Sequence, residues 1–301
     1  MAGSGSVGRD VLVSSTEQVR RSSARWQATV RSILRKSVSG LSVASLVGVC
    51  TIGSVFTLAP SASAIVGGVP VADGERPFAV QIEQQGEDGT WSHYCGAVLI
   101  DSRVVATAAH CAKFAEQGKL TIRLVVGRAN SNAPGGTVVT SDRFSVYSHP
   151  EFDTTTNTDL GLIVLDSPVS QARAMLPSLG TTLRPGHLVH AAGWGRTDLD
   201  DQAKPSRLQE AQLPVQKFDT EGGVWDKEFI CAGTAESRVA PGDSGGPLFA
   251  MKAHGKAVVY GLVSGDTNTC TGLFTNLAAP DIWKPFRAPL ASHGLGHVIP
   301  K

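Results

Sequence analysis

The sequence predicts an all-β fold, and three observations support this prediction. Short runs rich in β-branched residues recur along the chain and are separated by turn-rich segments. The chain contains 33 glycines and 16 prolines, which suits a fold of many short strands joined by turns. Only the tail, residues 281–291, has a pattern typical of a helix.

The expected strands follow one another at short intervals. An apolar strand at Pro247–Met251 directly follows a glycine-rich loop. In the tail, Asp281 is expected to cap the helix, and Pro285 and Pro289 leave its extent open. The other strand segments, in chain order, are Phe78–Ile82, Tyr94–Ile100, Thr121–Gly127, Thr137–Tyr147, Gly161–Leu165, Leu188–Ala192, Arg207–Val215, Ala257–Ser264 and Gly272–Leu277.

Residues 1–64 are a different kind of sequence and are predicted to be a secretion signal segment. Seven basic and two acidic residues lie in residues 1–36, and no charge follows until Asp73. The apolar run Leu41–Ala59 precedes Ala62-Ser63-Ala64, a small-residue cleavage site. An uncleaved membrane anchor is the alternative, because the uncharged run is long enough to span a bilayer. Cleavage after Ala64 would leave residues 65–301 as the folded domain.

The loop Ala240–Pro247 offers a candidate nucleophile, Ser244. Glycines on both sides allow positive φ angles and leave main-chain N–H groups uncovered, as an anion-stabilising pocket beside an attacking hydroxyl requires. The alternative is an ordinary turn, since Gly-Asp-Ser-Gly is also common turn composition.

Two further segments supply the partners that such a serine needs. His110 ends an apolar run and could accept the hydroxyl proton, while Asp159 opens an apolar strand and could hold the imidazole in the right tautomer. Taken singly, His110 could be a core histidine and Asp159 a strand-entry cap. Together with Ser244 they favour nucleophilic catalysis.

The chain order His110, Asp159, Ser244 resembles that of the chymotrypsin/trypsin-like serine peptidase family, and the sequence is similar to a secreted, bacterial-type member. Subtilisin-like and α/β-hydrolase enzymes carry the same residue types in other orders. The resemblance runs from Ile65 to about His293. It includes Ile65-Val66-Gly67-Gly68, Tyr94-Cys95-Gly96, Ala192–Thr197, Leu208–Ala211 with Pro214-Val215, and Phe229–Gly233.

The resemblance implies a fold of two six-stranded antiparallel Greek-key β-barrels with a short C-terminal helix. From Ile65 onward 237 residues remain, enough for two small barrels that share a cleft. The boundary between the two barrel subdomains is expected near residues 180–186.

The resemblance also implies roles for residues around the nucleophile. The N–H groups of Gly242 and Ser244 would bind the oxyanion. Ser264 would touch the aspartate of the triad, and its strand would line the substrate groove. Gly265 stands where the family commonly has tryptophan, which would open the groove.

Members of this family are usually activated when a cut frees an Ile-Val-Gly-Gly amine, which then pairs with the aspartate before the nucleophile. Here the pair would be Ile65 and Asp243. Because the predicted signal cleavage falls directly before Ile65, signal peptidase itself would be the activator. No separate propeptide is expected.

Four cysteines remain after Cys50 is assigned to the signal segment, and their number alone allows three pairings. The resemblance implies a bond between Cys95 and Cys111, next to His110. It leaves Cys231 to pair with Cys270, a bond that departs from the family pattern because the usual partners of these two positions are absent.

The specificity pocket is the part that the sequence defines least. The resemblance places its floor six residues before the nucleophile, at Arg238. This arginine could attract an acidic side chain, pair with Asp266 and fill the pocket, or point into solvent. A trypsin-like preference for basic side chains is therefore not expected.

Charge and motifs exclude several classes of function. Without the nine charged residues of the signal segment, 20 Lys and Arg stand against 24 Asp and Glu, a net charge of −4, which gives no electrostatic reason to bind nucleic acid. The sequence has no metal-ligand spacing of the H-E-x-x-H type and no phosphate-binding glycine loop, so neither a metal nor a cofactor is expected.

We therefore predict a secreted, monomeric serine endopeptidase that acts on proteins or peptides through an acyl-enzyme and has no stable membrane association after signal cleavage. Protein inhibitors of serine peptidases could bind the same groove. A secreted esterase with the same triad is the main alternative, and an inactive binding homologue is the other.

Overall fold

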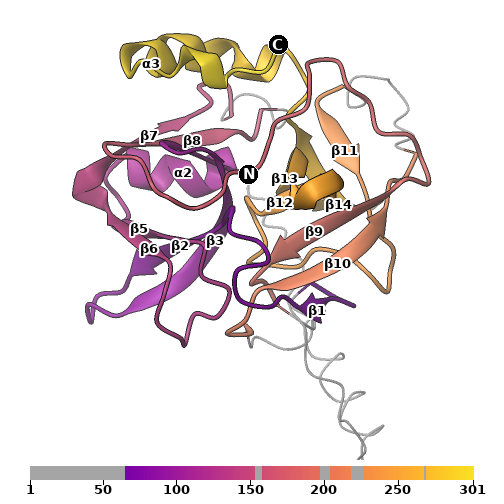
Figure 1. Ribbon diagram of the computed structural model, residues 1–301, viewed down its shortest axis with the longest axis horizontal. Coiled ribbons are helices and arrows are strands. Elements are labelled where there is room, and N and C mark those ends of the chain that lie inside the picture. The colour runs from indigo at the N-terminus through magenta and orange to yellow at the C-terminus, as the bar shows by residue number, and fades with distance from the viewer. Residues whose placement is uncertain (1–64, 153–157, 197–203, 218–226, 268) are drawn as a thin grey trace, which may run out of the picture. The chain divides into compact units, whose positions relative to one another are not determined.

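The computed structural model describes residues 65–152, 158–196, 204–217, 227–267 and 269–301. The predicted signal segment, residues 1–64, lies outside the described residues. Within them, the chain forms two antiparallel sheets of seven strands each and a few short helices (Figure 1). This is the two-barrel, all-β fold that the sequence predicts.

The first sheet is built from the N-terminal half of the domain, and its strand order is β6-β5-β2-β3-β4-β8-β7. Its central strands are rich in Val, Ile and Leu, and β8 is buried along its whole length. Helix α2 (Ala109–Glu116) leaves the end of β4 and packs against β7 and β8. The strands are β2 (Ala79–Gln85), β3 (Trp91–Asp101), β4 (Val104–Thr107), β5 (Ile122–Val126), β6 (Thr137–Thr140), β7 (Phe144–Ser148) and β8 (Gly161–Leu165).

The second sheet has the order β1-β10-β9-β12-β13-β14-β11. Residues 166–187 connect the two sheets and contain the range 180–186, although a division into subdomains there stays a prediction. The strands are β1 (Val69–Pro70), β9 (Leu188–Gly193), β10 (Gln209–Pro214), β11 (Phe229–Cys231), β12 (Pro247–Met251), β13 (Ala257–Thr267) and β14 (Cys270–Asn276).

Each sheet has one strand more than the six expected, for two different reasons. In the first sheet, the predicted strand Thr137–Tyr147 is divided by the 3-10 helix η1 (Ser141–Arg143) into β6 and β7. In the second sheet, the short strand β1 joins the edge of β10 through the pairs Val69–Glu210 and Pro70–Gln209.

The helices differ from the prediction at two places. Helix α2 was not expected, because its eight residues follow directly on an apolar strand and give too short a helical pattern to recognise. In the tail, a 3-10 helix η3 (Asp281–Phe286) precedes α3 (Arg287–Ser292). The prediction of Asp281 as N-cap was wrong: Pro280 holds that position, and the carboxylate of Asp281 pairs with Lys284 Nζ at 2.7 Å.

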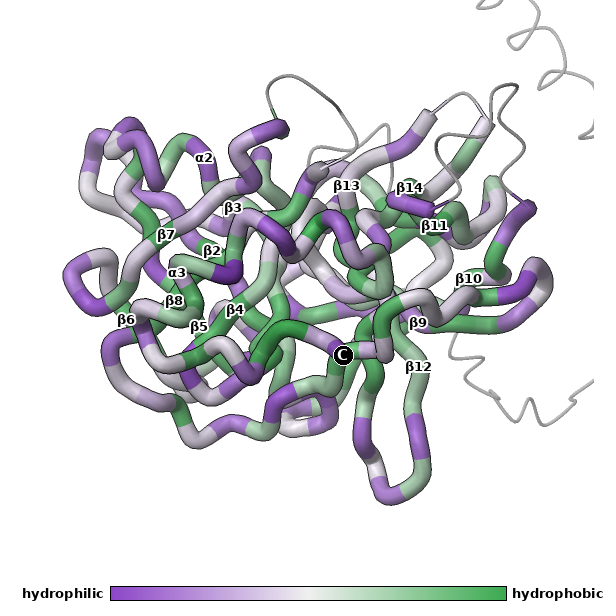
Figure 2. The backbone as a smooth tube through the Cα atoms, turned by 90° about the horizontal axis from the view of Figure 1, so that it is seen from above, coloured by the Kyte–Doolittle hydropathy of each residue, from purple (hydrophilic) through white to green (hydrophobic). Residues whose placement is uncertain are grey.

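One hydrophobic cluster joins the two sheets. It includes residues of every strand from β2 to β5 and also Trp194, Phe249 and Leu262 from the second sheet. The rings of Phe78 and Phe249 meet edge to face, with their centroids 5.3 Å apart. Hydrophilic residues gather instead at the outer turns of the chain (Figure 2). This shared core fixes the position of the loops that carry the predicted catalytic residues.

Candidate active site

His110 lies in the first turn of α2, just beyond β4, and is bound twice to Asp159. Its backbone N–H donates to Asp159 Oδ1 at 3.0 Å, and its ring Nδ1 lies 2.9 Å from Asp159 Oδ2. The ring stays partly exposed, with 32% of the side chain accessible. The neighbouring Cys111 is joined to Cys95 of β3, so the helix start is anchored to the sheet on which it packs.

Asp159 precedes β8 and is almost completely buried, at 2% exposure. A buried carboxylate is costly unless its oxygens are satisfied. In addition to the two bonds from His110, Asp159 Oδ2 accepts a hydrogen bond from the Ser264 hydroxyl at 2.6 Å. Ser264 belongs to β13, so side chains from both sheets meet at this carboxylate.

The loop that carries Ser244 packs directly on the chain that leads to His110. Ser244 O accepts a bond from Gly96 N at 2.8 Å. At Gly245, where φ is +77°, a Cβ atom would lie only 2.2 Å from the Thr107 hydroxyl and 3.1 Å from Ala108 N. Only glycine permits this approach, which places the serine beside the residues that immediately precede His110.

The backbone around Ser244 leaves two N–H groups free. Asp243 N, Gly245 N and Gly246 N donate to carbonyl oxygens of Ala240, Val263 and Asp243, respectively. The N–H groups of Gly242 and Ser244 have no acceptor among the described residues. These are the two groups that the sequence analysis assigns to the oxyanion.

Asp243 is completely buried beneath the loop and has no ion-pair partner in the described part of the chain. Its carboxylate accepts hydrogen bonds from Gly195 N at 2.7 Å and Ala240 N at 2.9 Å. Burial raises the pKa of Asp243 to about 7, although these two bonds and the nearby charge of Lys204 oppose the shift. Burial thus disfavours the ionised carboxylate, and a further cation beside it would favour ionisation.

Ile65 is likewise fully buried, in the core of the second sheet, with a φ of +60° that is unusual for a β-branched residue. Val66 pairs with Arg238, and its carbonyl accepts a hydrogen bond from Arg238 N at 3.2 Å. The segment that follows the predicted cleavage position is therefore docked on the loop that leads to Asp243.

A cavity of ≈ 160 Å³ opens beside the candidate nucleophile. Arg238, Gly265 and Asp266 lie in its wall together with Ser244. A Cβ atom at Gly265 would meet nothing within 4 Å, so this wall is open. Ser264, one residue away, points to Asp159 and does not line the cavity.

His93 of β3 is a residue of this site that the sequence analysis did not single out. Its Nε2 lies 2.8 Å from Gly242 O, and its Nδ1 is buried and has no hydrogen-bond partner among the described residues. Burial lowers the pKa of His93 to about 4, so the ring is neutral and Nε2–H donates to the carbonyl. Only the proximity of His93 to Cys95 in the sequence could have pointed to it.

The remaining cysteines form a second disulfide, Cys231–Cys270, which joins β11 to the start of β14. Atoms of Cys95, His110 and Cys111 lie within 4.8 Å of one another, as metal ligands would. Both sulfurs are in the disulfide, however, and a disulfide is not a thiolate ligand.

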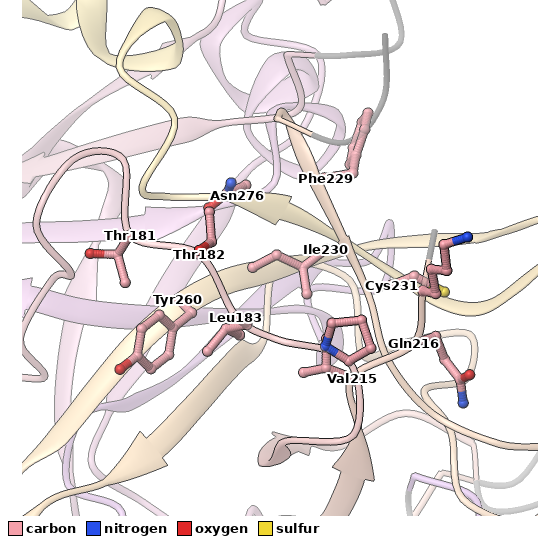
Figure 3. A pocket seen from close by; sticks show the side chains of 12 residues that line it. Thr181, Thr182, Leu183, Val215, Gln216, Phe229, Ile230, Cys231, Tyr260 and Asn276 are labelled. Carbon is pink, nitrogen blue, oxygen red and sulfur yellow. The ribbon is translucent and has the colours of Figure 1, made fainter. Parts of the chain in front are cut away.

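A further cavity of ≈ 240 Å³ lies on the second sheet (Figure 3). Leu183 of the inter-sheet connection, Ile230 of β11 and Tyr260 of β13 contribute to its wall. It contains none of the predicted catalytic residues, and Cys231, which also lines it, is held in its disulfide.

Two antiparallel sheets, with His110 bound to a buried Asp159 and the loop of Ser244 packed against Thr107 and Ala108, are typical of the class of two-barrel serine peptidases. A family model described as Trypsin matches residues 65–281, and the chain belongs to this family. The chain is 33% identical over 220 residues to granzyme F of Mus musculus. This alignment covers 69% of this chain and 86% of granzyme F. It is thus a serine endopeptidase, whose substrates are proteins. Because this relative is mammalian, it gives no support to the bacterial type.

Among the described residues, no helix has the length and apolar character needed to cross a membrane.

Proposed function

We propose that this endopeptidase cleaves peptide bonds through an acyl-enzyme, with Ser244 as nucleophile, His110 as general base and Asp159 as the residue that orients His110. The observation that carries the proposal is the pair of hydrogen bonds from His110 to the buried Asp159. Since the Nδ1–H group donates a hydrogen bond to the carboxylate, Nε2 is left as the basic nitrogen.

In the proposed first step, the Ser244 hydroxyl adds to the carbonyl carbon of the scissile bond while His110 Nε2 takes its proton. The oxyanion is bound by the free N–H groups of Gly242 and Ser244. His110 then protonates the leaving amine, and the C–N bond breaks. Water repeats the sequence on the acyl-enzyme and releases the acid and the free serine.

Asp159 stays ionised and stabilises the imidazolium in both steps. Ser264, which donates to Asp159 Oδ2 at 2.6 Å, holds the carboxylate in position. Ser264 is therefore proposed as a positioning residue rather than a catalytic one.

Activation is proposed to follow the freeing of the Ile65 amine. The docked Ile65–Val66 segment and the unpaired, buried Asp243 support this proposal. An ammonium group beside Asp243 would compensate the charge that burial now disfavours, and the loop with Gly242 and Ser244 would be stabilised. Secretion, signal cleavage before Ile65, a monomeric state and binding of protein inhibitors are parts of the same proposal.

Labelling with an active-site phosphonate tests the assignment. The Ser244→Ala variant should lose all labelling and its casein hydrolysis, because it removes the hydroxyl that is proposed to attack the substrate. Ser292→Ala, an exposed position on α3, is the matched control and should keep both. Persistent labelling of Ser244→Ala would overturn the triad, and hydrolysis of a nitrophenyl ester without cleavage of casein would favour the esterase.

A further inference from the structure

The cavity beside Ser244 contains a cation, Arg238, that forms no ion pair with the described residues. Eight residues line this cavity, and Arg238 and Asp266 are the two charged ones. Arg238 is half-buried, and its Nε is inaccessible to solvent and has no hydrogen-bond partner in the described part of the chain. The other lining residues are Val239, Ala240, Pro241, Ser244, Val263 and Gly265.

Arg238 differs from three other arginines of the described chain, although Arg196 Nε is likewise buried without a hydrogen-bond partner there. Arg76, Arg123 and Arg128 are also partly buried, and each forms an ion pair with a carboxylate at 2.5–2.7 Å. Among the described residues, Arg238 has no such pair, although Asp266 lines the same cavity. A buried guanidinium N–H without an acceptor is unfavourable, so Arg238 is arranged for an acceptor that comes from outside.

The backbone keeps Arg238 in place. Its N–H donates to Val66 O at 3.2 Å, and Val239 and Ala240, which follow it, are buried. Asp266, by contrast, is exposed at the rim and is free of ion pairs to the described residues. The guanidinium of Arg238 therefore lies in the inner part of the cavity, and the carboxylate of Asp266 lies on its solvent side.

We infer that the enzyme cleaves after acidic residues: the side chain of the Asp or Glu whose carbonyl Ser244 attacks enters this cavity, and its carboxylate pairs with Arg238. A guanidinium can bind a carboxylate through two parallel hydrogen bonds. A basic side chain would meet like charge at the same place, and a neutral one would leave Arg238 unpaired. This inference rests on the proposed function, because it needs Ser244 as the nucleophile.

The test uses peptides that differ only in the residue before the scissile bond: Glu, Gln, Asp, Asn, Lys and Leu. The wild-type domain, with its N-terminus at Ile65, should hydrolyse the Glu peptide with a kcat/KM roughly 10- to 100-fold above that of the Gln peptide, since a site built around a charge rejects the neutral isostere. The kcat/KM of the Asp peptide should likewise exceed that of the Asn peptide, and the Lys peptide should have the lowest kcat/KM.

Three variants and one control locate the preference for acidic residues in the cavity. Arg238→Gln should reduce the Glu-to-Gln ratio of kcat/KM to about one, while Arg238→Lys should keep part of it as a point charge. Arg287→Gln, at an exposed position on α3, is the matched control and should leave the ratio unchanged. Asp266→Asn should raise the ratio, because it removes a negative charge at the rim. Each ratio is measured within one preparation and does not depend on the fraction of folded enzyme.

Two outcomes would overturn the inference while leaving the proposed function intact. One is a phosphonate-labelled, active enzyme that prefers the Lys or Leu peptide. The other is a Glu preference that Arg238→Gln does not change. Absence of labelling at Ser244, with no cleavage of any peptide, would instead contradict the proposed function itself.

Discussion

His93 is neutral in the folded enzyme because burial lowers its pKa to about 4, and its ring bonds to Gly242 O in the loop before the nucleophile. In the unfolded chain the pKa is near 6.5, so between these values the unfolded state binds a proton that the folded state does not. Stability therefore falls as the pH drops from about 6.5 to 4. The full loss due to this group is about 3 kcal/mol.

The replacement His93→Gln should remove most of this pH dependence, because its amide can donate to the same carbonyl but does not titrate. Urea unfolding at pH 7 and pH 4.5 measures the effect. The wild-type should lose more stability between the two pH values than the variant does. Equal losses would contradict the assignment of a buried, neutral ring to His93.

The pH dependence of stability that Asp243 contributes has the opposite sign to that of His93. The folded-state pKa of Asp243, about 7, lies above its ordinary value of 3.8. The contribution of Asp243 to the free energy of unfolding is therefore fully present below about pH 4 and is lost as the pH rises through 7. The loss is about 4 kcal/mol while Ile65 remains joined to Ala64. A free Ile65 ammonium should lower this pKa and recover much of that stability.

Chains that begin at Ile65 and at Ala62 test this prediction in a Ser244→Ala background, which prevents self-cleavage. The Ile65 chain should be the more stable one at pH 7, and the difference should shrink as the pH falls toward the lowered pKa of Asp243 in the Ile65 chain, because protonation then removes the charge in both chains. It should also shrink above pH 8, where the amine loses its charge. A constant difference across this range would argue against an ion pair.

At the scale of elements, the bond Cys231–Cys270 closes a loop of 39 residues that contains the nucleophile. A chain-entropy argument gives such a cross-link about 4 kcal/mol of stability. The double variant Cys231→Ser, Cys270→Ser should lose a comparable amount in urea unfolding. A loss below about 1 kcal/mol would mean that the pairing of β11 with β14 holds this loop without the disulfide.

The elements that the sequence predicted best are the strands with continuous apolar runs. Segments such as Gly161–Leu165 and Pro247–Met251 coincide with β8 and β12, because a strand that is buried on both faces along all or most of its length requires apolar side chains at successive positions. The short edge strand β1, the single turn of η1 and the eight-residue helix α2 were missed. Their conformation depends on neighbours that are distant in the sequence, such as Gln209 and Glu210 for β1.

At the scale of the whole molecule, a partly buried ion pair joins the segment before the first sheet to the second sheet. Arg76, directly before β2, binds both carboxylate oxygens of Glu210 in β10, at 2.5 and 3.0 Å. His190 Nδ1 lies 2.7 Å from the same carboxylate, and the hydrogen bonds that Arg76 donates to Glu210 raise the pKa of Arg76. Breaking a buried pair on one side leaves an uncompensated charge.

The variant Glu210→Gln should therefore be destabilised by about 3 kcal/mol in urea unfolding. Asp73→Asn is the control, because it removes an exposed partner of Arg207 and should cost less than about 1 kcal/mol. Similar small losses in both variants would show that the hydrophobic cluster alone holds the two sheets together.

The sequence by itself determined the residue types of the chemistry, since the order of His110, Asp159 and Ser244 and the glycines around the serine are local patterns. Only the tertiary structure decided that Asp159 is buried with three donors, that the N–H groups of Gly242 and Ser244 are left free, and that Arg238 stands unpaired beside the nucleophile. Pairing and burial arise between segments far apart in the chain, so they depend on how the two sheets pack and not on any one stretch of sequence.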